Sequence, residues 1–454
     1  MPGIASSFSN EITVLSDGGF VVTWVSNKVY NNHSTSFRHI YGQRYDADGN
    51  MMGDEFRVSA HLKEEWDPSI TALSDGGFVV TWESDDPDAR YSSSDSVFGQ
   101  RYDAQGKAVG NEFQVNTYSK GNQRDSSVVA LSDGGFVVTW RSHDQDGSGT
   151  GIFGQRYDAQ GKAVGGEFQV NTYSNGNQLT ASAVALSDGG YVVVWDSREI
   201  TGQRYDAQGK AVGSEFQVNT YTVRAVENPS VAALSDGGYV VAWNNIKYTV
   251  DGEQNRVRNY DIYARRYDAQ GNAVGGDFKV NTPTPEGKKA RASVTALSDG
   301  GFVVTWHFKS DAILGQRYDA QGNAVGREFK IDTGHEGAAY VLAYSVAALS
   351  DGGFVVSFND SRAHIVVQRF DVPDPTSPDP VSTPALKPTT APEPAPTPDP
   401  VSTPAPKPEP APTPDPVSTP ALKPAPAPKP APEPERAPQS GLPNTGTPQP
   451  DGGY

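Results

Sequence analysis

The chain has 454 residues, a formal net charge of -17 and no cysteine, and it is rich in glycine (47) and proline (35). The absence of cysteine excludes disulfides and cysteine-ligated zinc or iron–sulfur sites, and the acidic balance argues against binding to nucleic acid or anionic lipid. No run of about 18 apolar residues occurs, so the sequence predicts no membrane span.

The chain begins with MPGIASSFSNEITVLSDGG, which lacks the basic and apolar regions of a standard signal peptide. We therefore expect export by another route, a mature form, or a fragment of a longer chain.

One motif, LSDGG, then recurs at spacings of 48 to 63 residues. Its seven copies begin at Leu15, Leu73, Leu131, Leu186, Leu234, Leu297 and Leu349. A second block follows each copy, as in GQRYDAQGKAVGNEFQVNT at 99–117, but the seventh copy stops at VQRFDV (367–372). Repeats of this length are typical of propellers and linear arrays.

Each repeat predicts four strands. In the third copy, 127–131 and 135–140 flank a Ser-Asp-Gly hairpin turn, and 153–158 and 167–172 flank AQGKAVGG. Gly161 in that segment is expected to adopt a positive φ, because glycine alone does so without steric cost.

The second and fourth strands differ in what should cover them. Segment 135–140 (GFVVTW) is apolar or small on both faces, which predicts burial between two sheets. Segment 167–172 (EFQVNT) alternates apolar and polar residues, which predicts an outer strand covered on one face. One such sheet cannot bury both faces alone, whereas stacked copies can.

We therefore predict an all-β fold: a seven-bladed β-propeller of four-stranded antiparallel blades over residues 1–372. The alternative is an open array of small β-sandwiches. Because the last repeat lacks its fourth segment, we expect 27 strands, and closure by packing of the first blade against the last.

The two ends of such a propeller differ in sequence. The Ser-Asp-Gly-Gly and Asp-Ala-Gln-Gly hairpins share one end, here called the turn end, and barely change between repeats. The other connections form the varied end; one is VSNKVYNNHSTSFRHI and another only DSREI. Ligand sites concentrate on variable loops of a rigid scaffold, so we place any site at the varied end. The alternative is that unconstrained loops drift.

Aromatic residues of the varied loops are the candidate ligand contacts, because they supply flat apolar area with a polar edge. They are Trp66, Tyr91, Tyr118, Tyr173 and Tyr248. The alternative for Tyr118 and Tyr173 is that they cover the outer strand.

One segment resembles half of a calcium loop: HDQDGSGTG, with Asp144 and Asp146 at alternate positions. An acidic solvated turn is the favoured interpretation. We expect no cofactor, with calcium at these two residues as the single candidate.

An arginine occupies the same place in every repeat, within QRYD or its variants. The seven residues are Arg44, Arg101, Arg156, Arg204, Arg266, Arg317 and Arg369. Seven equivalent copies favour a structural pairing with a nearby carboxylate over catalysis. No zinc-protease, nucleophile-elbow or P-loop motif is present, and no catalytic residue is predicted.

From residue 373 the composition changes, and 373–441 is a Pro-rich repeat that predicts an extended polyproline stalk. The remainder, 442–454, contains LPNTG: Leu442, Pro443, Asn444, Thr445 and Gly446. This pentapeptide resembles the LPxTG motif of surface proteins that sortase attaches to Gram-positive cell walls. In that family, cleavage falls between the positions of Thr445 and Gly446. The family has an apolar segment and basic tail after the motif, whereas TPQPDGGY follows here, so a chance match is the alternative.

The repeats at 11–372 resemble tandem LSDGGFVVTW…GQRYDAQGNAVGGEFQVNT units of large bacterial secreted and surface proteins. This resemblance implies an extracellular or cell-surface location. The separate resemblance of LPNTG implies sortase and the cell wall as partners. We predict an adhesin or lectin-like propeller that binds glycan or protein at its varied end. One alternative is a carbohydrate-active enzyme, which requires coupled carboxylates in a deep central pocket. The other is a passive spacer without a pocket.

Overall fold

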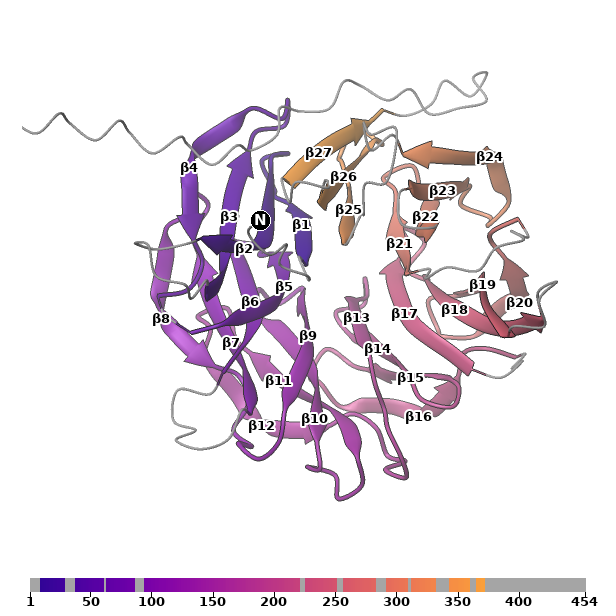
Figure 1. Ribbon diagram of the computed structural model, residues 1–454, viewed down its shortest axis with the longest axis horizontal. Coiled ribbons are helices and arrows are strands. Elements are labelled where there is room, and N and C mark those ends of the chain that lie inside the picture. The colour runs from indigo at the N-terminus through magenta and orange to yellow at the C-terminus, as the bar shows by residue number, and fades with distance from the viewer. Residues whose placement is uncertain are drawn as a thin grey trace, which may run out of the picture. The chain divides into compact units, whose positions relative to one another are not determined.

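The computed structural model describes residues 9–28, 37–60, 63–85, 94–220, 225–250, 256–282, 291–308, 312–331, 343–359 and 365–371. These residues form 27 strands and no helix, and the strands make seven antiparallel sheets around a common centre (Figure 1). The predicted seven-bladed β-propeller is thus confirmed. In the described part of the chain, no helix is long and apolar enough to cross a membrane. The Pro-rich stalk and LPNTG lie outside it.

Each blade consists of consecutive strands, numbered from the centre outwards. Blade 1 contains β1 (Asn10–Val14), β2 (Phe20–Lys28), β3 (Phe37–Tyr45) and β4 (Met51–Arg57). Blade 2 contains β5 (Glu65–Ala72), β6 (Phe78–Asp85), β7 (Asp95–Tyr102) and β8 (Ala108–Gln114). Blade 3 contains β9 (Gln123–Ala130), β10 (Phe136–His143), β11 (Thr150–Tyr157) and β12 (Ala163–Gln169). Blade 4 contains β13 (Ala181–Ala185), β14 (Tyr191–Asp196), β15 (Ile200–Tyr205) and β16 (Ala211–Gln217). Blade 5 contains β17 (Ala225–Ala233), β18 (Tyr239–Val250), β19 (Arg256–Tyr267) and β20 (Ala273–Lys279). Blade 6 contains β21 (Ala292–Ala296), β22 (Phe302–Phe308), β23 (Ala312–Tyr318) and β24 (Ala324–Ile331). Blade 7 contains β25 (Tyr344–Ala348), β26 (Phe354–Asn359) and β27 (Ile365–Phe370).

The second strand of each blade is buried on both faces, as predicted. In β10, Trp140 belongs to a core cluster that contains Val79 of blade 2, whereas Val137 belongs to another that contains Trp195 of blade 4. The hydrophobic core is therefore divided among the interfaces between blades, and each blade depends on its neighbours for burial.

The outer strand begins earlier in the chain than predicted. The sequence placed it at 167–172, whereas β12 spans Ala163–Gln169 and its first half is exposed. The reason is a bulge: Gly165 has a φ of 73° where the pairing register between β11 and β12 shifts, so pairing starts directly after the hairpin. In that hairpin Gly161 has the expected positive φ of 80°.

Substitution of Gly154 should show how closely the outer strand packs. A Cβ at this position would lie 2.6 Å from Cζ of Phe168, so Gly154→Val should lower the free energy of unfolding by about 1–3 kcal/mol through overpacking. Gly166→Val on the exposed part of β12 is the matched control, because a Cβ there meets no atom within 4 Å. Equal urea midpoints for the two variants would contradict this packing.

The repeated arginines have the predicted structural role. In all seven blades the arginine of the third strand pairs with the Asp of LSDGG, for example Arg101 with Asp75 at 3.0 Å. The same Asp accepts the backbone N–H of the second glycine of its turn, as Gly77 shows at 2.9 Å. Each turn is thus fixed by a charge-assisted bond, which explains the uniform turn end without a ligand.

Ring closure relies on contacts between blades 7 and 1, as predicted. The described part of blade 7 has three strands, and Val367 of β27 packs with Ile12 and Phe20 of blade 1. The amide of Asn10 donates to the carbonyl of Ala343 at 3.1 Å and to Oδ1 of Asn359 at 2.5 Å. Its oxygen accepts from Ser357 Oγ at 2.8 Å.

Candidate functional site

The first strands of the seven blades surround the axis of the propeller (Figure 1). A central cavity of about 430 Å³ lies among the residues at which these strands begin. The first strand runs from the varied end toward the LSDGG turn, so this cavity lies toward the varied end. Another hollow, of about 560 Å³, lies by the outer strands of blades 1 and 2 around Phe56 and Tyr102.

Two rings of equivalent residues line the central cavity. The residues six positions before the leucine of LSDGG form the mouth ring: Ser9, Asp67, Asp125, Thr180, Asn228, Arg291 and Ala343. Those four positions before it form the serine ring: Glu11, Ser69, Ser127, Ser182, Ser230, Ser293 and Ser345, of which all but Glu11 are serines. The cavity is thus lined mainly by hydroxyl, carboxyl and guanidinium groups.

The serine hydroxyls are oriented by the neighbouring blade. Ser69, Ser182 and Ser230 each accept the backbone N–H of a residue on the next blade, at 3.1 to 3.4 Å. A hydroxyl that accepts from the backbone still has a hydrogen to donate. Several O–H groups can therefore donate to a ligand in the cavity.

Three residues of the mouth ring lie at backbone irregularities. Asp67, Asp125 and Asn228 have φ values of 43°, 53° and 54°, at points where the pairing of β5, β9 and β17 with the second strand shifts. Asp and Asn tolerate this left-handed conformation better than other non-glycine residues. The bulge therefore favours short polar side chains at the mouth.

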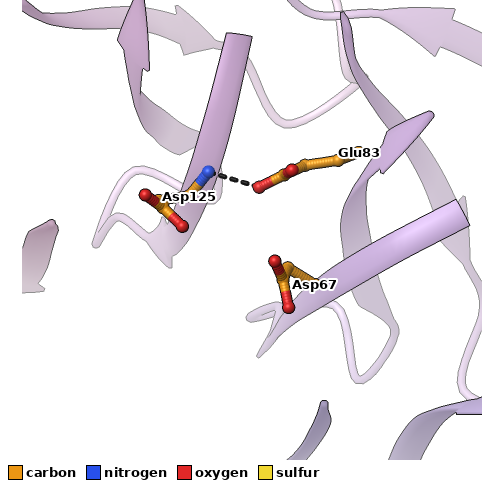
Figure 2. A group of neighbouring side chains, drawn as sticks. All are labelled: Asp67, Glu83 and Asp125. Atoms are coloured by element: carbon orange, nitrogen blue, oxygen red, sulfur yellow. Dashed lines mark hydrogen bonds between the residues drawn. The ribbon is translucent and has the colours of Figure 1, made fainter. Parts of the chain in front are cut away.

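A cluster of three carboxyl groups adjoins the cavity on the side of blades 2 and 3. Oxygen atoms of Asp67, Glu83 and Asp125 all lie within 4.8 Å of one another (Figure 2). Glu83 follows Trp82 on β6, is 3% exposed, and accepts the backbone N–H of Asp125. Arg141 Nε contacts Asp125 Oδ2 at 2.6 Å. These oxygens could coordinate a hard cation such as calcium.

Burial makes ionisation of several of these groups unfavourable. It raises the pKa of Glu83 well above the ordinary range, and the carboxyls of Asp67 and Asp125 add to this effect. Burial also raises the pKa of Asp125, although the nearby charge of Arg141 acts in the opposite direction. Burial raises the pKa of Glu11 to about 7, although the hydrogen bond from Ser345 lowers it.

The opposite side of the mouth ring contains a cation. Arg291 directly precedes β21, its side chain is exposed, and it lines the cavity. Next to it, the ring of His307 lies 4.8 Å from the ring of Tyr344. Burial lowers the pKa of His307 to about 4, and the charge of Arg291 contributes, so this imidazole is neutral.

The predicted aromatic contacts are dispersed around the varied end. Trp66 is half-buried and directly precedes Asp67. The guanidinium carbon of Arg38 lies over the Trp66 ring, 5.8 Å from the ring centroid. Tyr118 is half-buried, and Tyr173 and Tyr248 are 54% and 42% exposed. These four residues do not line the central cavity, and Tyr91 lies outside the described residues. Their contact with a ligand stays a prediction.

Asp144 and Asp146 lie in the connection between β10 and β11. Asp146 Oδ1 accepts the backbone N–H of Ser148 at 3.1 Å and Oδ2 accepts from Asn171 at 3.4 Å, as in an ordinary polar turn. Asp144 is exposed and contacts His143 at 3.0 Å. Among the described side chains these two do not join a cluster of three acidic or histidine groups, so calcium at this loop stays a prediction.

The sequence analysis did not identify the residues that line the cavity. An alignment of the repeats on their leucine would have shown them, because position -6 reads S, D, D, T, N, R, A and position -4 reads E followed by six S. The single Arg stands at position -6 and the single Glu at position -4, and both positions line the cavity on the axis. These two positions are the signal for a site.

No family model matches the chain, and no curated protein matches it. Solved structures of similar form are distant. A protein of unknown function from Dyadobacter fermentans is 11% identical with a TM-score of 0.45, and the match covers 71% of this chain and 97% of that one. A Hadza microbial sialidase is 12% identical with a TM-score of 0.47 and coverages of 80% and 65%. A Penicillium chrysogenum α-L-arabinanase is 14% identical with a TM-score of 0.45 and coverages of 67% and 92%. At these values the matches do not establish a function.

Proposed function

We propose that the protein is a glycan-binding propeller of the adhesin or lectin type, which holds a sugar residue in the central cavity at its varied end. The proposal rests on one observation: a cavity of about 430 Å³ is lined by hydroxyl and carboxyl groups from equivalent positions of the blades. A cavity of this size fits a small ligand. Sugars offer hydroxyl groups that both donate and accept, which matches this lining.

A glycan array probed with the full chain tests the proposal. We expect specific signals that Asp67→Asn reduces about tenfold, because Asp67 lines the cavity and a carboxylate accepts stronger hydrogen bonds from sugar hydroxyls than an amide does. Asp144→Asn is the matched control, because it removes a charge from the same end outside the cavity. Running the array with calcium and with a chelator separates a metal-dependent site from a direct one. A blank array would reject the proposal.

A glycoside hydrolase is a second candidate, favoured by the proximity of Asp67 and Asp125, whose carboxyl oxygens lie within 4.8 Å of each other. Retaining glycosidases use two carboxyl groups separated by about 5 Å. This candidate predicts release of p-nitrophenol from p-nitrophenyl glycosides and complete loss of turnover in Asp67→Asn. Binding without turnover supports the first candidate.

We also propose that the protein acts outside the cell, with residues 373–441 as a spacer and LPNTG as a sortase substrate. The resemblance of the repeats and of LPNTG to bacterial surface proteins supports this. Incubation of the full chain with a sortase and triglycine should yield a product joined at Thr445. An unchanged mass would contradict the attachment.

A further inference from the structure

We propose that the sugar bound in the central cavity carries a carboxylate group, and that Arg291 binds it. This inference rests on the proposed glycan-binding function and specifies the class of sugar.

The mouth ring is electrostatically polarised. The first strands of the seven blades form a closed ring in the order β1, β5, β9, β13, β17, β21 and β25. In this ring, β25 and β1 lie between β21 and β5, and β17 and β13 lie between β21 and β9. Arg291 before β21 is thus opposite Asp67 and Asp125. A bound ligand would face one cation and, across the cavity, carboxyl groups.

The guanidinium of Arg291 is available to a ligand. Among the described residues, no carboxylate lies within 4.0 Å of it and no side chain accepts a hydrogen bond from it. Its positive charge nevertheless acts on the cavity, because it favours the ionised forms of Glu11 and Asp125 and the neutral form of His307. By contrast, Arg141 and the turn-end arginines are already paired with aspartates.

The carboxyl groups opposite Arg291 do not repel an acidic sugar strongly. Asp125 contacts Arg141 at 2.6 Å, and buried Glu83 does not line the cavity. Asp67 then accepts hydroxyl groups of the sugar ring, while the serine hydroxyls donate to its oxygens. A guanidinium binds a carboxylate through two parallel hydrogen bonds, which also fixes the orientation of the sugar.

Calorimetric titration of the full chain with glucuronate, glucose and glucosamine tests the inference. We expect glucuronate to bind about tenfold more tightly than glucose, because an ionic hydrogen bond adds to the shared hydroxyl contacts. Arg291→Gln should abolish this preference, because a neutral amide cannot form the ionic pair with the carboxylate. Arg198→Gln is the control: Arg198 is exposed on the short varied-end connection between β14 and β15, outside the cavity.

Three results would overturn the inference. Equal or tighter binding of glucose or glucosamine to the native protein rejects the carboxylate but retains the proposed function. An unchanged preference for glucuronate in Arg291→Gln shows that another group binds the acid. Failure of all three sugars to bind, together with a blank glycan array, rejects both the inference and the proposed function.

Discussion

Asn10→Ala should lower the free energy of unfolding by about 3–5 kcal/mol, a large share of the stability of an ordinary domain. Asn10 is 2% exposed and makes three hydrogen bonds to blade 7. Its removal leaves the buried side chains of Asn359 and Ser357 without these partners, and each unsatisfied group costs about 1–3 kcal/mol. Urea unfolding followed by tryptophan fluorescence measures the change, since a tryptophan lies at the core of most blades.

The matched control for Asn10 is Ser126→Ala, at the same position in blade 3. Ser126 is half-buried, and its hydroxyl lies 3.1 Å from that of Thr81. It contributes one neutral hydrogen bond, so its loss should cost no more than about 1 kcal/mol. Similar urea midpoints for the two variants would mean that the junction of blades 7 and 1 is no more sensitive than the others.

Asp196→Asn should stabilise the propeller by about 4 kcal/mol at pH 8 and leave its stability at pH 4 almost unchanged. Burial raises the pKa of Asp196 from 3.8 to about 7, and the carboxyls of Glu227 and Asp125 act in the same direction. In the unfolded chain the group ionises near its ordinary pKa. The contribution of Asp196 to the free energy of unfolding is therefore most favourable below about pH 4, declines as the pH rises to 7, and is constant above it.

An asparagine at position 196 is neutral at every pH, so the variant avoids this loss of stability. Thermal unfolding of both proteins between pH 4 and pH 8 should give melting temperatures that diverge as the pH rises. Asp144→Asn serves as the control, because it replaces an exposed carboxyl group instead of a buried one. Parallel profiles for the native protein and Asp196→Asn would show that Asp196 does not titrate in this range.

Much of the fold could be predicted from the sequence because the repeat specifies it locally. The alternation in GFVVTW fixes a strand with two buried faces, and the seven LSDGG motifs set the number of blades. The outer strand was misplaced since its start depends on Gly165, whose positive φ creates a bulge that no alternation pattern reveals.

The candidate site could not be predicted in the same way. Asp67 and Arg291 are 224 positions apart, and the position that they share in the repeat varies from copy to copy, with Asp125 as the second aspartate. Only closure of the ring brings these single residues to one axis, and a bulge at Asp67 sets the direction of its side chain. The sequence analysis predicted aromatic ligand contacts because aromatic rings offer a large apolar area, whereas the cavity is lined by small polar groups.

Each sheet consists of consecutive strands, and this limits the order in which the blades and their interfaces can form. Every strand pairs within its own repeat, so a blade can form its hydrogen bonds before the next repeat has left the ribosome, and such local contacts favour fast folding. The bond between Asn10 and Asn359 joins residues 349 positions apart. The junction of the first and last blades is therefore completed last, after the six other interfaces can already exist.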